Sequence, residues 1–285
     1  MKKILVTGAT GFIGNYVVQQ LLKNNCTVIA TSSDEQKAKQ YSWFSKVKYI
    51  PFKLEDFDST INYFSFFDSP DAVIHLAWEG LPNYKSLFHF EVNLPRHYTF
   101  LKNLVTNGAA DITVTGTCFE YGMQQGCLDE DMPSAPANPY SLAKDTLRKF
   151  LQELQKVNPF YLKWARLFYM YGSGQNANSL LSQLDKALAN GETSFNMSGG
   201  EQERDYLPVE KVAEYISAIA LQHSVEGIIN CCSGKPVTVK ELVENYLAEK
   251  QKNIALNLGY YPYPDYEPMR FWGNDKKLKT IISNG

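Results

Sequence analysis

The chain has 285 residues, of which 44% are hydrophobic and 20% are charged, and its formal net charge is −2. This composition is typical of a globular protein with a sizeable core, and it lacks the basic excess that favours nucleic acid or an anionic membrane. No apolar run approaches the ~18 residues of a membrane-spanning helix, and the five cysteines lack metal-binding spacing. We therefore expect a cytoplasmic protein from a reducing compartment, with no metal site and no nucleic-acid or membrane partner.

Short apolar segments alternate with helical ones through the first two thirds of the chain. The segments with the character of strands are residues 3–8, 27–31, 47–52, 71–78, 111–117 and 160–168. Apolar residues with helical spacing lie between them, over 12–25, 92–107 and 140–157. Strands that alternate with helices in this way predict an α/β protein with a doubly wound parallel sheet, covered by helices on both faces.

The pattern changes after Tyr171. A polar loop leads to a helical segment at 180–191, and a turn feeds a second helical segment within 204–223. Residues 260–273, YYPYPDYEPMRFWG, contain too many aromatic residues and prolines for a regular helix or strand. We expect this segment to form an irregular lid over a site.

The glycines of VTGATGFIG follow the first strand and open the first helix. Gly8 permits a tight turn, Gly11 lets the backbone approach a pyrophosphate, and Gly14 lets the helix pack closely on the sheet. The N-terminus of the helix then faces the phosphates. A glycine-rich turn without a ligand is the alternative, but the strand–turn–helix context favours a dinucleotide site.

The residue at the end of the second strand bears on the choice of cofactor. An acidic residue at this position binds the ribose 2′-hydroxyl of NAD. This chain has Ser32 there, followed by Ser33, and Asp34 comes late. Because small hydroxyls accommodate a 2′-phosphate that a carboxylate would repel, we predict NADP, with NAD as the alternative.

The stretch ANPYSLAKD places Tyr140 and Lys144 one helical turn apart. Asn138 can cap this helix, and Pro139 suits its first turn. An ammonium beside a phenol lowers the pKa of the phenol, which can then exchange a proton with a carbonyl oxygen as hydride is transferred. The alternative is an exposed pair on a surface helix, but downstream of a dinucleotide site we favour a catalytic pair.

Six motifs that are typical of a single protein family are spread over nearly the whole chain: TGATGFIG, DAVIHLAW, VTGTCFEYG, NPYSLAK, ARLFYMYGSG and ERDYLPVEKVAEYI. With them the chain resembles the extended short-chain dehydrogenases/reductases that act on nucleotide sugars as epimerases, dehydratases or reductases. The resemblance implies that Thr117 completes a catalytic triad with Tyr140 and Lys144, its hydroxyl bonding the substrate oxygen. The cofactor contacts that it implies are Gly8, Thr10, Gly11, Phe12, Ile13, Gly14, Ser32, Leu54, Leu76, Ala77, Tyr140 and Lys144.

The resemblance also implies two domains and a dimer. A Rossmann-type NAD(P)-binding domain would comprise residues 1–167, with 207–230 returning to it. A smaller C-terminal α/β domain would bind the nucleotide-diphosphate sugar and comprise 168–206 and 231–285. A homodimer would form through the helices over 92–107 and 140–157, as is common in the family.

Departures from the family pattern narrow the reaction. Dehydratases of the family carry an Asp-Glu pair after the catalytic Thr, where this chain has Cys118 and Phe119. Members resembling GDP-fucose synthase carry a cysteine two residues after the catalytic hydroxyl, and that position is Phe119 here. Lys53 replaces the Asp that usually meets adenine. Glu120, which replaces a common valine, either hydrogen-bonds locally or points into the pocket.

For the nucleotide diphosphate we nominate Arg204 and Arg270, because guanidinium groups match pairs of phosphate oxygens. The alternatives are a salt bridge to a neighbouring carboxylate for Arg204 and a surface charge for Arg270. Tyr169 stands where the family has Asn, so we expect it to contact the sugar in a reshaped pocket. Arg166 lies inside a strand segment and is expected to pair within the scaffold.

The remaining triad of Thr117, Tyr140 and Lys144 suffices for a single hydride transfer. The resemblance therefore favours reduction of the C4 ketone of a nucleotide-linked 4-keto-6-deoxyhexose by NAD(P)H, in deoxysugar or surface-polysaccharide biosynthesis. A dTDP sugar is favoured because the tail resembles that of dTDP-4-keto-6-deoxyhexose reductases. The same triad would serve an NAD-dependent C4 epimerase. A non-catalytic dinucleotide-sensing regulator is the remote alternative, since a sensor has no need of a tuned phenol.

Overall fold

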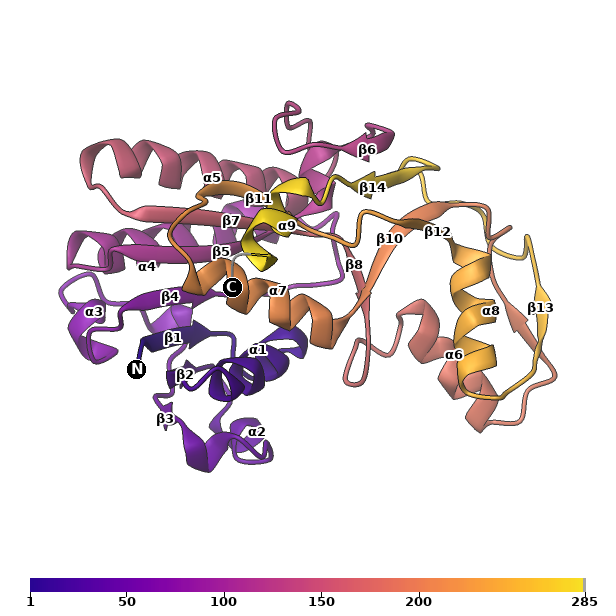
Figure 1. The fold of residues 1–285 in the computed structure, drawn as a ribbon, viewed down its shortest axis with the longest axis horizontal. Coiled ribbons are helices and arrows are strands. Elements are labelled where there is room, and N and C mark those ends of the chain that lie inside the picture. The colour runs from indigo at the N-terminus through magenta and orange to yellow at the C-terminus, as the bar shows by residue number, and fades with distance from the viewer. Residues whose placement is uncertain (284–285) are drawn as a thin grey trace.

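A seven-stranded sheet forms the centre of the larger part of the molecule (Figure 1). The computed structural model describes residues 1–283, and all neighbouring strands of this sheet run parallel, in the order β11-β7-β5-β4-β1-β2-β3. The strands are β1 (Lys3–Thr7), β2 (Thr27–Thr31), β3 (Lys48–Tyr49), β4 (Ala72–His75), β5 (Asp111–Thr117), β7 (Tyr161–Leu167) and β11 (Gly227–Cys231). The strand order reverses direction at β1 and β4, and ligands of such sheets bind at the carboxyl ends of the strands there.

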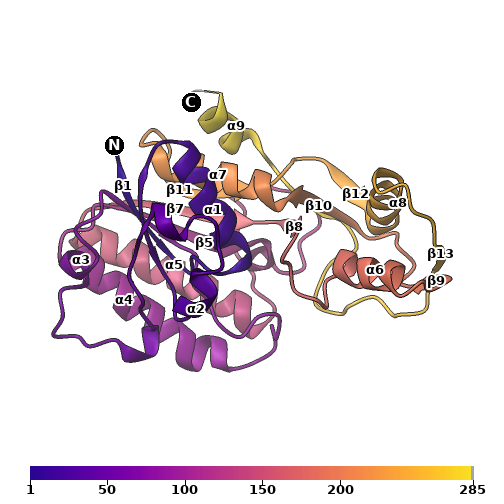
Figure 2. The same cartoon turned by 90° about the horizontal axis from the view of Figure 1, so that it is seen from below.

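Helices cover both faces of this sheet (Figure 2). One face carries α1 (Phe12–Lys23), α7 (Val209–Leu221) and α9 (Lys276–Ile282), and the other carries α3 (Tyr63–Phe66), α4 (Leu94–Thr106) and α5 (Pro139–Val157). Every residue of β5 is buried, as expected for a strand that has a helix layer on each side. The short helix α2 (Glu35–Ala38) lies between β2 and β3. The predicted doubly wound α/β fold is confirmed.

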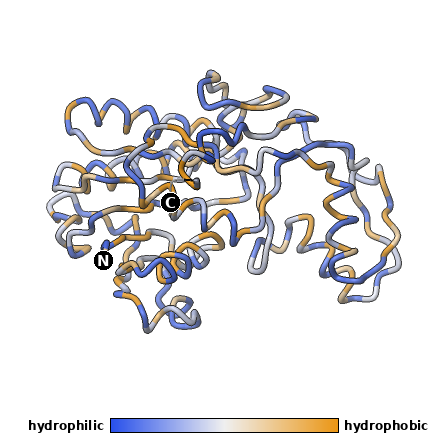
Figure 3. Tube along the Cα trace, viewed as in Figure 1, coloured by the Kyte–Doolittle hydropathy of each residue, from blue (hydrophilic) through white to orange (hydrophobic). Residues whose placement is uncertain are grey.

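A smaller unit projects to the right in Figure 1 and has a core of its own. Its elements are β8 (Tyr169–Tyr171), α6 (Leu180–Ala189), β9 (Ser194–Asn196), β10 (Glu203–Pro208), β12 (Pro236–Thr238), α8 (Val239–Glu249) and β13 (Ala255–Asn257). β10 lies between β8 and β12, while β9 pairs with β13. Hydrophobic and hydrophilic residues alternate along α8 (Figure 3), whose apolar side packs on this core.

The last helix departs from the predicted division of the chain. We placed 231–285 with the smaller unit, but Leu278 and Ile281 of α9 are buried in the core formed by α1, α7 and the large sheet. An amphipathic helix packs on whichever core its apolar side meets, and the sequence does not say which that is. Residues 260–270 are irregular as expected, and the segment ends in β14 (Phe271–Gly273), which pairs with β6 (Gly126–Leu128).

Strand β4 ends three residues earlier than predicted. It ends at His75, so Leu76, Ala77 and Trp78 leave the sheet and are free to line a site. None of the helices within residues 1–283 combines the length and the apolar character that crossing a membrane requires.

Candidate active site

The turn between β1 and α1 is built around three glycines, and two of them, Gly8 and Gly14, occupy positions that admit no side chain. Gly8 has a φ of +69°, in the left-handed region that favours glycine, and a Cβ there would lie 2.8 Å from the backbone nitrogen of Ala77. A Cβ on Gly14 would overlap the carbonyl oxygen of Gly8. Gly11, at the start of α1, has a φ of −71° that any residue can adopt. Its lack of a side chain therefore keeps the space in front of the helix open, and this arrangement fits a pyrophosphate.

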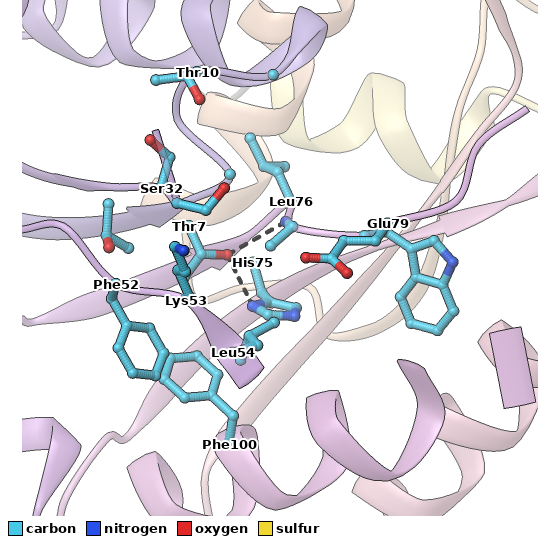
Figure 4. Close-up of a pocket in the computed structure, with 16 residues that line it drawn as sticks. Thr7, Thr10, Ser32, Phe52, Lys53, Leu54, His75, Leu76, Glu79 and Phe100 are labelled. Carbon is cyan, nitrogen blue, oxygen red and sulfur yellow. Dashed lines mark hydrogen bonds between the residues drawn. The ribbon is translucent and has the colours of Figure 1, made fainter. Parts of the chain in front are cut away.

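A cavity of about 190 Å³ opens beside this turn, at the carboxyl ends of β1, β2 and β4 (Figure 4). The predicted cofactor residues that line it are Gly8, Thr10, Gly11, Ser32, Leu54, Leu76 and Ala77. Phe12 and Ile13 line the adjoining cavity instead, and Gly14 lines neither because it packs against the turn. Phe52, His75, Trp78 and Phe100 also line the first cavity and were missed. His75 and Trp78 lie at or just after the end of β4, beside the reversal in strand order, and this place could have identified them.

Ser32 directly follows β2 and lines this cavity. The Ser32 hydroxyl lies 2.8 Å from the hydroxyl of Tyr49. Lys53 lines the same cavity with a side chain that is 51% exposed, 3.7 Å from the carboxylate of Glu55 (Figure 4). Glu79 is the one carboxylate among the described residues that line this cavity, and it follows Trp78 rather than β2. Among the described residues, no carboxylate from the end of β2 lines this cavity.

A second cavity, of about 380 Å³, lies at the end of β5 and brings Thr117 and Tyr140 together. Helix α5 begins as predicted, with Pro139 in its first turn and the Asn138 side chain accepting the Ser141 N–H at 2.9 Å. The backbone N–H of Tyr140 donates to the carbonyl oxygen of Tyr84 at 3.1 Å. These bonds fix the position of Tyr140 in the first turn of α5.

Lys144 is buried one turn after Tyr140 on α5, but its amine contacts other groups than the Tyr140 phenol. The Nζ atom donates to the carbonyl oxygen of Thr115 at 2.9 Å and lies 4.0 Å from the centre of the Trp78 ring. Burial lowers the pKa of Lys144 to about 7, against the opposing charge of Glu120. Lys144 therefore lies at the balance between its charged and neutral forms near neutral pH.

Burial also raises the pKa of Tyr140, and the nearby Tyr84 and Glu120 add to the rise, while a hydrogen bond with Thr117 acts in the opposite direction. The expectation that Lys144 lowers the pKa of this phenol is wrong for this structure. Loss of water around the phenol dominates, and the Lys144 amine is directed to Thr115 instead. Tyr140 is consequently protonated throughout the neutral range.

Glu120 follows the first of its two predicted alternatives and hydrogen-bonds within the protein. It is fully buried in the 3-10 turn Cys118–Tyr121. Its carboxylate accepts the backbone N–H of Thr117 at 2.8 Å and the Nε–H of Arg166 at 2.8 Å. Arg166 thus pairs within the scaffold, as expected.

The two predicted diphosphate ligands lie away from Tyr140. Arg204 is buried, and its Nη2 donates to Glu267 at 3.0 Å. Its salt-bridge partner is therefore far away in the sequence, not one of the adjacent carboxylates that we considered. The Arg270 side chain is 60% exposed and pairs with Glu203 at 3.0 Å. Neither arginine lines the cavities described here.

A third cavity, of about 550 Å³, continues the Tyr140 cavity towards the smaller unit. Tyr169 lines both cavities where they join, and its buried hydroxyl has no hydrogen-bond partner in the part of the chain that the structure describes. Tyr84, Gln175 and Asn176 also line both, and Tyr266 and Glu267 of the irregular tail line the third cavity. Tyr266 and Glu267 belong to the segment 260–273 that was expected to lie over a site, and they do line this cavity. Sequence reasoning missed Tyr84, Gln175 and Asn176, because they lie in loops without a pattern.

The sequence of this chain is similar to those of known proteins over nearly its whole length. Residues 4–232 match the model of the NAD dependent epimerase/dehydratase family. A dTDP-6-deoxy-L-talose 4-dehydrogenase (NAD(+)) from Aggregatibacter actinomycetemcomitans is 30% identical over 271 residues, which cover 95% of this chain and 98% of that protein. A UDP-glucose 4-epimerase from Halalkalibacterium halodurans is 26% identical over 304 residues, which cover 98% of this chain and 89% of that protein.

The fold is shared with solved structures as well. A UDP-glucuronic acid 4-epimerase from Bacillus cereus, in complex with UDP-glucuronic acid and NAD, superposes with a TM-score of 0.84 at 22% identity, covering 99% of this chain and 93% of that one. The Rossmann-type sheet, the glycine turn and the matched residues agree with one another. The chain belongs to the NAD-dependent epimerase/dehydratase family of extended short-chain dehydrogenases/reductases.

Proposed function

We propose that this protein reduces the C4 ketone of a nucleotide-linked 4-keto-6-deoxyhexose. The observation that carries the proposal is the composition of the cavity that Thr117 and Tyr140 line. The described residues around that cavity include no Asp, Glu, His, Lys or Arg. Elimination, or epimerisation beside the ketone, needs a further acid or base, whereas hydride transfer at C4 needs only one proton donor.

Besides the phenols of Tyr84 and Tyr169, whose pKa values burial raises, Cys118 is the group among the described residues of this cavity that could act as a base. Burial raises the pKa of its thiol, and the charge of Glu267 adds to the rise. The thiol is therefore neutral at working pH, and the thiolate that would remove a proton from carbon is not formed. This supports a single hydride transfer over the other reactions of the family.

The glycine turn and its cavity would hold the cofactor, with Gly8 and Gly11 at the pyrophosphate and Ser32 at the adenosine ribose. When bound, the reduced nicotinamide supplies the hydride. Tyr140 donates its proton to the C4 oxygen, and the Thr117 hydroxyl hydrogen-bonds the same oxygen. A phenol that stays protonated at neutral pH suits this direction of reaction.

The name of the 30%-identical relative supports the position on the sugar and the nucleotide. That protein is a 4-dehydrogenase of a dTDP-linked 6-deoxyhexose. A dehydrogenase acting at C4 and a reductase acting at C4 catalyse one equilibrium in opposite directions. We therefore favour a dTDP sugar as the substrate of this chain.

For the cofactor we propose NADPH, because Ser32 and Lys53 leave room and positive charge for a 2′-phosphate. The name of the same relative specifies NAD(+), so both cofactors belong in any assay. We further propose that Tyr169 contacts the sugar, that Arg204 and Arg270 serve the nucleotide diphosphate, and that residues 1–167 with 207–230 act as the NAD(P)-binding domain.

We also propose that the protein acts as a homodimer through α4 and α5. Leu142 and Phe150 of α5 are 46% and 43% exposed, so they would supply apolar surface to such a contact. Light scattering on the purified protein tests this, and replacement of Phe150 by Glu should yield monomers.

The proposed reaction is tested by absorbance at the reduced-nicotinamide band. The protein is mixed with NADPH or NADH and, separately, with dTDP-, GDP-, CDP- and UDP-linked 4-keto-6-deoxyhexoses. Stoichiometric loss of absorbance with one sugar is expected, and it identifies the base and the cofactor together. Loss with none of the sugars contradicts the proposal.

An NAD-dependent C4 epimerase is the second candidate, and the 26%-identical relative named as a UDP-glucose 4-epimerase favours it. Such an enzyme would interconvert two sugars with no net loss of absorbance, which chromatography of the products detects. If neither change occurs with any sugar but the dinucleotide binds, a sensing role remains.

A further inference from the structure

Glu120 is a carboxylate without exposed surface, and it lies behind the cavity wall that carries Thr117. It accepts the Thr117 N–H at 2.8 Å and so closes a capping box, in which the Thr117 hydroxyl accepts the Phe119 N–H at 3.3 Å. On the other side it accepts the Trp164 indole N–H at 3.0 Å and the Arg166 Nε–H at 2.8 Å. One carboxylate thereby ties the end of β5 to β7.

The residue before Thr117 makes room for this arrangement. A Cβ at Gly116 would overlap both the indole nitrogen of Trp164 and the Oε1 atom of Glu120. Glycine inside a strand weakens the strand, and it often marks a place where another group approaches the backbone closely. At Gly116 the approaching groups are the Trp164 indole and the Glu120 carboxylate that is bonded to it, so the glycine leaves room for this hydrogen bond.

We propose that Glu120 is a positioning residue, which holds Thr117 towards the C4 oxygen and supplies a fixed negative charge to the Tyr140–Lys144 pair. The inference rests on the proposed function, because reduction at C4 is the step that Thr117 and Tyr140 serve. It assigns a role to the one polar residue of the VTGTCFEYG segment that departs from the family pattern.

The charge of Glu120 favours the protonated form of both partners. It opposes the burial that lowers the pKa of Lys144, and it adds to the burial that raises the pKa of Tyr140. The effect on Lys144 keeps its amine cationic near neutral pH, whereas the effect on Tyr140 makes the phenol a weaker acid, so only the first favours proton transfer to the C4 oxygen.

Other groups face this pair from the elements packed around α5. They are Tyr84 after β4, Cys118 after β5, His75 on β4, His89 before α4, His97 on α4, and Arg148 and Arg166 beyond Glu120. Burial lowers the pKa of His75 to about 3, and it lowers the pKa of His89 and His97 as well. The histidines are therefore neutral and the arginines keep a constant charge, which leaves Glu120 as the negative charge of this group.

The test separates position from charge by means of two variants and a matched control. Glu120→Gln removes the charge, whereas Glu120→Asp keeps the charge but shortens the side chain by one methylene. Glu130→Gln is the control, since Glu130 is also a buried carboxylate and accepts the Asn230 N–H at 2.9 Å. Turnover is measured with the sugar found above, and the Lys144 amine is titrated by NMR of lysine-labelled protein, with K144M to assign its signal.

We expect Glu120→Gln to move the Lys144 titration to lower pH and to lower kcat further than Glu130→Gln does. Glu120→Asp should lower kcat while Lys144 titrates as in the wild type. The proposal is overturned if Glu120→Gln leaves the Lys144 titration unmoved, or if its kcat falls no further than that of Glu130→Gln.

Two further arms keep the test decisive. If Glu120→Gln does not fold, because Arg166 is left as an unpaired buried charge, the double variant E120Q/R166M removes both charges and takes the same measurements. If the wild type reduces no 4-keto sugar, the proposed function fails separately. The Lys144 titration, which needs no substrate, then still decides whether Glu120 supplies the charge.

Discussion

The amine of Lys144 donates to the carbonyl oxygen of Thr115 at 2.9 Å, and this bond joins helix α5 to strand β5 two residues before Thr117. The bond helps to hold Tyr140 and Thr117 at one cavity. It also explains why burial decides the charge of Lys144, since the amine has exchanged water for one carbonyl dipole and the face of Trp78.

Replacement of Lys144 by Met should change how stability depends on pH. In the unfolded chain the amine holds its proton up to about pH 10, but in the folded protein its pKa is about 7. Between these values the unfolded state binds more protons, so the free energy of unfolding of the wild type should rise with pH. Denaturation by urea across this range should show a smaller rise in K144M, and parallel curves would contradict the lowered pKa.

Replacement of Tyr140 by Phe should lower turnover by a factor of at least about a hundred, because the proton donor is lost. The ring remains in place, so the dissociation constant of the dinucleotide, measured by fluorescence, should stay unchanged. Tyr161→Phe is the control, since Tyr161 is exposed at the other end of the sheet. Equal turnover in Y140F and the wild type would remove Tyr140 from the mechanism.

Two glycines of the turn should fail in different ways when each is replaced by Ala. A methyl group at Gly14 overlaps the carbonyl of Gly8, so G14A should lose about 1–3 kcal/mol of stability. At Gly11 the backbone accepts any residue and the methyl group enters the space in front of α1. Because that methyl group would lie 3.1 Å from the Gly8 carbonyl oxygen, a tight contact rather than an overlap, G11A should lose less stability than G14A and bind the dinucleotide weakly. Calorimetry and fluorescence titration distinguish these outcomes, and equal melting temperatures for the two variants would contradict the prediction.

Replacement of Ser32 by Asp should move the cofactor preference towards NADH. A carboxylate at the end of β2 repels a 2′-phosphate, and a like-charge contact of this kind changes the ratio of kcat/KM values by at least about tenfold. Lys53→Ala should weaken the use of NADPH alone, because Lys53 lines the same cavity. A wild type that already prefers NADH, as the name of its relative would suggest, contradicts the NADPH proposal.

The sequence was most informative where chemistry and local structure depend on the same few residues. The glycine turn, the cap at Asn138 and the Tyr140–Lys144 spacing each follow from short-range rules, and the structure has the turn and the cap as expected. The direction of the pKa of Tyr140 could not be predicted, because it depends on how deeply the folded chain buries the phenol.

Most of the features that the sequence could not predict are contacts between residues that lie far apart in the sequence. Glu120 meets Arg166 across two strands, and Arg204 meets Glu267 from an irregular segment 63 residues away. No periodicity in a single sequence marks such pairs, since each depends on the register of the sheet or the path of a loop. The same limit hid the packing of α9 on α1 and α7.

The Arg204–Glu267 pair yields a final prediction about the nucleotide diphosphate. Glu267→Gln leaves the buried Arg204 without its counter-charge, so the variant should lose about 3–5 kcal/mol of stability. If Arg204 serves the diphosphate, added dTDP should raise the melting temperature of E267Q more than that of the wild type. Glu203→Gln, which breaks the exposed pair with Arg270, should lose within about 1 kcal/mol. Equal dTDP-dependent shifts in E267Q and the wild type would mean that Arg204 only supports the tail.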